Sequence, residues 1–146
     1  MKNLKLYHIP IAYMLVYVVA ILGTGVWLFL LSQGLGSNEI LTTLTKIIDT
    51  PAPKSMHHLV EVSSPHLFAM GMLIFVVAHF LLFSTTFSQK FSQKMSILLF
   101  IAALLNIGAC VFISLGLVVS GWIKLASMGL FIVLFLGLLG MLAFSL

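Results

Sequence analysis

The stretch PHLFAMGMLIFVVAH, residues 65–79, decides the class of protein to which this chain belongs. Two histidines, His66 and His79, enclose twelve residues that have neither a charged nor an amide side chain. A run of this kind is typical of a helix inside lipid, where an ionisable side chain is costly unless it is paired or binds something. The apolar residues therefore predict the environment, and the two histidines are the first candidates for a function.

Composition extends this interpretation to the whole chain of 146 residues, of which 62% are hydrophobic and 7% are charged. Soluble domains contain about 25% charged residues, so the chain is expected to be an integral membrane protein. Four apolar runs are each long enough to cross about 30 Å of hydrocarbon as a helix. They cover residues 9–32, 67–87, 95–117 and 122–144. We predict one all-α membrane domain, a bundle of four transmembrane helices, because backbone in lipid must satisfy its own hydrogen bonds.

The charged residues predict the orientation of the bundle in the cell (inner) membrane. One side has lysines and no acidic residue: Lys2, Lys5, Lys90 and Lys94. On the other side lysines and acidic residues balance: Lys46, Lys54 and Lys124 with Glu39, Asp49 and Glu61. Positive charge favours the cytoplasm, which predicts cytoplasmic N- and C-termini and an outer loop at residues 34–63. The bilayer is the expected environment, and nothing in the sequence suggests a nucleic-acid partner.

The outer loop contains a helical pattern of its own. Apolar residues recur at helical spacing between residues 38 and 49, which predicts a short amphipathic helix on the outer membrane surface. Pro51 and Pro53 then end it. Further on, Ser64 is a suitable N-cap and Pro65 a suitable first helical residue, so we expect the second membrane helix to begin there.

The histidines allow a purely structural interpretation. A neutral His79 needs only a hydroxyl or amide on a neighbouring helix, which Tyr13, Tyr17 or Asn106 offers at broadly similar depth. Asn106 itself needs a partner, because a buried amide without a hydrogen bond is costly.

Haem ligation is the functional interpretation, since neutral imidazole is a good axial ligand of iron. The pair His66 and His79, together with the four-span plan, resembles the b-type di-haem membrane cytochromes, in which two histidines of one helix bind two stacked haems. The resemblance implies haem b, with these two residues as axial ligands about 20 Å apart along the helix. It also implies electron transfer between a quinol or another redox partner and an acceptor on the outer side.

The chain departs from that family in three respects. His79 follows His66 by thirteen residues, and at about 100° per residue the two rings lie about 140° apart around an ideal helix. The third and fourth spans contain no histidine, and the chain contains no arginine for the haem propionates. His57 or His58 is expected to complete a site at His66. His8 lies about 9–12 Å from the predicted level of His79 and is therefore an unsuitable sixth ligand for an iron bound by His79. A homodimer or a five-coordinate iron would suit the site at His79 better.

Tyr17 and Asn106 complete the residues that we expect around a cofactor. Copper is the alternative, because thioether and imidazole ligands suit Cu(I). The candidate ligands for a metal are Met56, His57, His58, His66, His79, Met70 and Met72. A third hypothesis is a cofactor-free assembly subunit of a larger membrane complex. Cys110 is the single cysteine, so a disulfide within the chain and a paired-cysteine motif are excluded. No residue pattern indicates a catalytic site, and whether the protein is an enzyme stays open.

Overall fold

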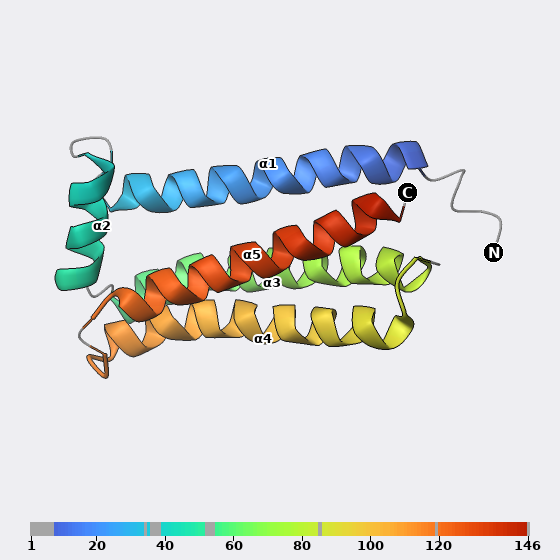
Figure 1. The fold of residues 1–146 in the computed structure, drawn as a ribbon. Helices are drawn as coiled ribbons and strands as arrows, with labels where there is room; N and C mark the ends of the chain where they lie inside the picture. The colour runs from blue at the N-terminus through green and yellow to red at the C-terminus, as the bar shows by residue number, and fades with distance from the viewer. Residues whose placement is uncertain are drawn as a thin grey trace.

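The computed structural model describes residues 8–33, 35, 39–51, 55–84, 86–118 and 120–145, except for the side chains of Met56 and His58. Figure 1 shows the helices in these residues. They are α1 (His8–Ser32), α2 (Ile40–Asp49), α3 (Met56–Leu82), α4 (Gln89–Ser114) and α5 (Trp122–Phe144). Four of them are long and apolar enough to cross a membrane, and α2 is short. The all-α class, the four long apolar helices and the short helix in the connection after α1 are confirmed.

The long helices run side by side, and α2 lies across one end of them (Figure 1). We call this the α2 end. Helix α1 begins and helix α5 ends at the opposite end, where α3 also connects to α4. An even number of membrane crossings produces this arrangement, with the first and last helix ends on one side.

The core lies between α3, α4 and α5. Its fully buried side chains include Ile74 and Val77 from α3, Leu99 from α4, and Phe135 and Leu138 from α5. Helix α1 packs mainly along α5. Among its described residues only Ile11 and Val18 are buried, both in the half of the helix away from the α2 end. Met14, Leu15 and Leu22 are partly buried against the core, and much of the remaining surface of α1 presents apolar side chains outward, as a lipid-facing helix does.

Helix α3 begins about two turns earlier than expected, so the predicted start at Ser64 and Pro65 is wrong. The helix continues from Met56 through Pro65. Pro65 has no N–H to donate to the carbonyl of Glu61, a loss that usually disfavours a helix interior. Burial of Leu59, which is 6% exposed, holds the added turns against the bundle. Tertiary packing thus outweighs the local proline signal.

The other end of α3 also differs from the prediction, because the helix stops at Leu82 instead of continuing to residue 87. Ser88 then caps α4, and its Oγ accepts a hydrogen bond from the backbone N–H of Phe91 at 3.3 Å. His79 therefore lies in the last turn of α3, about 4.5 Å along the axis from the final helical residue. It is therefore nearer to the end of its helix than the apolar run indicated.

Helix α2 is fixed to the bundle where α5 begins. Its buried residues are Thr43 and Ile47, whereas Leu41 is exposed, so one face packs inward. The backbone N–H of Gly121 donates to the carbonyl of Ile48 at 3.0 Å. A Cβ at position 121 would overlap the carbonyl oxygen of Ile47, so the close approach of α2 requires glycine there.

This contact leads to a prediction. Gly121→Ala should push α2 away from the start of α5, because the added methyl group occupies the position of the Ile47 carbonyl oxygen. We expect a loss of about 1–3 kcal/mol in the free energy of unfolding, as for other overpacked contacts. The thermal midpoint in detergent should fall, and trypsin should cut faster at the exposed Lys46 of α2.

Gly129→Ala is the matched control, since a Cβ there would meet no atom within 4 Å. Alanine favours a helix over glycine by about 1 kcal/mol, so this variant should be as stable as the natural protein or slightly more stable. An unchanged midpoint and an unchanged cleavage rate in Gly121→Ala would show that α2 is not held by this contact.

Candidate functional site

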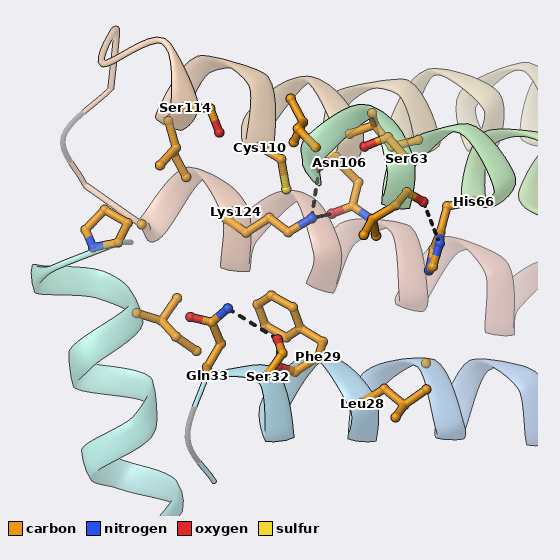
Figure 2. A pocket seen from close by; sticks show the side chains of 18 of the residues that line it. Leu28, Phe29, Ser32, Gln33, Ser63, His66, Asn106, Cys110, Ser114 and Lys124 are labelled. Atoms are coloured by element: carbon orange, nitrogen blue, oxygen red, sulfur yellow. Dashed lines mark hydrogen bonds between the residues drawn. The ribbon is translucent and has the colours of Figure 1, made fainter. Parts of the chain in front are cut away.

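A cavity of about 380 Å³ lies at the α2 end, bordered by α1 on one side and by α3, α4 and α5 on the other (Figure 2). Pockets that bind small molecules usually occupy about 300–1,000 Å³. Most of the wall is apolar. The nitrogen- and oxygen-bearing side chains that line it are Ser32, Gln33, Ser63, His66, Asn106, Ser114 and Lys124.

A charge-assisted polar contact in this wall joins α5 to α4. The Nζ atom of Lys124 donates to the side-chain Oδ1 of Asn106 at 2.8 Å and to its backbone carbonyl at 3.1 Å. The same ammonium lies 5.8 Å from the ring centroid of Phe29 on α1, within the range of a cation–π contact. Lys124 is thus the partner that the amide of Asn106 was expected to need.

His66 lines the same cavity from α3. Its Nδ1 lies 3.1 Å from the carbonyl oxygen of Val62, one turn earlier in the helix (Figure 2). A carbonyl only accepts, so in the neutral ring the proton is on Nδ1 and the lone pair is on Nε2. Histidines that bind metals usually donate their second ring nitrogen to a carbonyl or carboxylate in this way. His66 is therefore held in the form that suits a ligand.

Three of the residues predicted for a site come together here. Besides His66 and Asn106, the cavity is lined by Met70, which follows His66 by one helical turn. Cys110 of α4 also lines it, although its thiol was not among the predicted site residues.

His79 does not share this cavity. It is exposed on α3 and lies between two aromatic rings. The centroid of its ring is 5.9 Å from that of Phe75 and 5.1 Å from that of Phe83. Tyr17 is 71% exposed on α1, and His8, the first residue of that helix, is half-buried. None of these three lines the cavity, and the hydrogen bonds of Asn106 go to Lys124 and not to His79.

The structure also separates His57 and His58 from His66, because all three lie in α3 and not in a loop. His57 precedes His66 by nine residues and His58 precedes it by eight, which corresponds to about 13.5 and 12 Å along the helix axis. One metal ion cannot reach His66 and either of them within a single chain. The side chains of Met56 and His58 fall outside the described residues. Within the described part of the chain, no group of three or more His, Cys, Asp or Glu residues could hold a metal ion.

Lys124 is the site residue that the sequence interpretation missed. We counted it among the charges of the outer side, although it lies inside the predicted span 122–144. A lysine within an apolar span is itself a signal of function or pairing. Its partner was not recognisable, because Asn106 is 18 residues earlier in the sequence.

Comparison with known proteins places the chain in a family. No curated protein and no solved structure matches it. A family model described as a transmembrane helical domain matches residues 33–146, which include α2 to α5 and every cavity residue except those on α1. The chain belongs to this family of transmembrane helical domains, Aq_1264_TM.

Proposed function

We propose that this protein is a membrane-embedded, haem-binding electron-transfer protein, with one b-type haem in the cavity at the α2 end and His66 as an axial ligand. The observation that supports it best is the contact of His66 Nδ1 with the carbonyl of Val62 at 3.1 Å, which leaves Nε2 free to bind iron. Bound haem would supply one-electron chemistry. The protein would supply the ligand, the apolar surroundings and the position in the membrane.

The walls of the cavity fit a large apolar group of this kind. The half of α1 that lines the cavity contributes no fully buried side chain, since the buried residues of α1 are Ile11 and Val18. That wall is thus less tightly packed than the side formed by α3, α4 and α5. Electrons would pass between a quinol or another redox partner in the membrane and an acceptor beyond the α2 end.

The proposal differs from the di-haem plan in the number of haems. His66 and His79 are both exposed, but His66 lines the cavity, whereas His79 lies among exposed aromatic rings outside it. His79 would bind a second haem only if another protein, such as a second copy of this chain, covered that face. The first proposal therefore concerns the cavity at His66 alone.

The absorption spectrum of the purified protein tests this directly. Protein produced with an adequate haem supply should show a Soret band and visible bands that change on reduction. His66→Ala should lose most of the bound haem, measured as haem per protein, because the axial ligand is removed.

His79→Ala is the matched control, since it removes a histidine of the same helix from outside the cavity. It should keep the haem content and the spectrum of the natural protein. A full spectrum in His66→Ala, or a colourless natural protein, would refute the proposal. Copper without haem would instead favour the metal-handling function, and co-purification with a larger complex without any cofactor would favour an assembly subunit.

We also propose that the α2 end faces the outside of the inner membrane. Lys90 and Lys94 are exposed at the opposite end, where α4 begins, and positive charge favours the cytoplasm.

Cysteine labelling in intact cells tests this orientation. In a Cys110→Ser background, a membrane-impermeant maleimide should label Thr45→Cys on α2 and should not label Gln93→Cys on α4. Both positions are exposed, so accessibility within the protein is matched. The reverse labelling pattern would place the α2 end in the cytoplasm.

A further inference from the structure

Lys124 brings a positive charge into a cavity whose wall is mostly apolar and whose other described polar side chains include no carboxylate. It is the third residue of α5 and is half-buried, and the apolar residues that line the same cavity include Leu28, Phe29 and Ile107. A charge in such surroundings is unfavourable unless an opposite charge or strong hydrogen bonds compensate for it.

The contacts of Lys124 compensate only in part. Its ammonium group has three N–H donors. Two acceptors are the carbonyl oxygens of Asn106, and the aromatic neighbour is Phe29. All three groups are neutral, and no Asp or Glu is among the described residues that line the cavity. The positive charge is therefore held in place by neutral groups, with its counter-charge still to be supplied.

The rest of the cavity indicates the shape of the group that supplies it. The lining on α1 extends from Ser32 to Gly25, which corresponds to about 10 Å along the helix axis. Beyond Lys124 the wall is formed mainly by apolar side chains of α1, α3 and α4, and α1 packs mainly along α5. A molecule with one anionic group and an apolar body matches such a site. One ammonium balances the single charge of a carboxylate.

We infer that this cavity binds the carboxylate of a membrane amphiphile, with Lys124 as its counter-ion and Asn106 as the residue that positions the ammonium. Two sources offer the same chemistry. One is a propionate of haem, and in this form the inference rests on the proposed function. The other is a fatty acid from the bilayer, and in this form it does not depend on iron or on His66.

Cys110 provides a built-in probe for the fatty-acid source, because it is the only cysteine and it lines the cavity. Protein prepared without haem in non-ionic detergent is treated with N-ethylmaleimide in the presence of oleate or of oleyl alcohol, which has the same chain and no charge. We expect oleate to protect Cys110 at a concentration at least about tenfold lower than oleyl alcohol does, since charge-assisted hydrogen bonds are the stronger ones.

Substitutions at Lys124 then assign the preference to its charge. Lys124→Met should abolish the difference between the acid and the alcohol, and Lys124→Arg should retain it. Lys90→Met, at an exposed lysine at the other end of the bundle, should behave as the natural protein does. If Lys124→Met does not fold, the comparison of the two ligands on the natural protein decides alone.

A parallel titration tests the haem source by the Soret band. The haem-free protein should bind haem at least about tenfold more tightly than the dimethyl ester of haem, which lacks the carboxylates, and Lys124→Met should lose this preference. Equal binding of acid and neutral forms in both pairs would overturn the inference even if the protein binds haem. A preference for oleate in a protein that binds no haem would uphold the inference and refute the proposed function.

Discussion

The contact between Lys124 and Asn106 is the constraint on which the α2 end of the molecule depends. Inside lipid, neither an ammonium nor an amide is tolerable without a partner, and here each supplies the other with donors or acceptors at 2.8 and 3.1 Å. The pair therefore sets the relation of the first turn of α5 to the second half of α4. Gly121 lies directly before that first turn, and its backbone N–H donates to the carbonyl of Ile48, which joins α2 to the same end of α5.

The cavity is a consequence of this arrangement and of the uneven packing of α1. Interior positions of α3, α4 and α5 are filled by residues such as Ile74, Leu99 and Phe135, which leave little space between these helices. At the α2 end, α1 no longer contributes buried side chains, and polar groups replace part of the apolar filling. Space for a ligand thus exists where the bundle changes from close apolar packing to paired polar groups.

The fold class follows from the sequence to a greater extent than the helix boundaries do. Composition and the length of the apolar runs were sufficient for four long helices, because hydrocarbon thickness imposes a minimum length on each. The ends were less predictable, since a helix does not have to stop at the membrane surface. Helix α4 begins at Gln89 and not at residue 95, and α3 continues through Pro65, because capping by Ser88 and burial of Leu59 act beyond the apolar run.

The candidate site was predictable only in part, for a related reason. His66, Met70 and Asn106 were recognised from residue type and depth, and they do line one cavity. Lys124 was not recognised, because its role depends on a hydrogen bond to Asn106, which is 18 residues away and cannot be predicted from a local sequence pattern. The angle of about 140° between the rings of His66 and His79 was the most useful local signal. In a single bundle with one interior, two side chains so far apart around a helix cannot both face inward. Here His66 lines the cavity although its side chain is exposed, whereas His79, also exposed, lies between Phe75 and Phe83 outside the cavity.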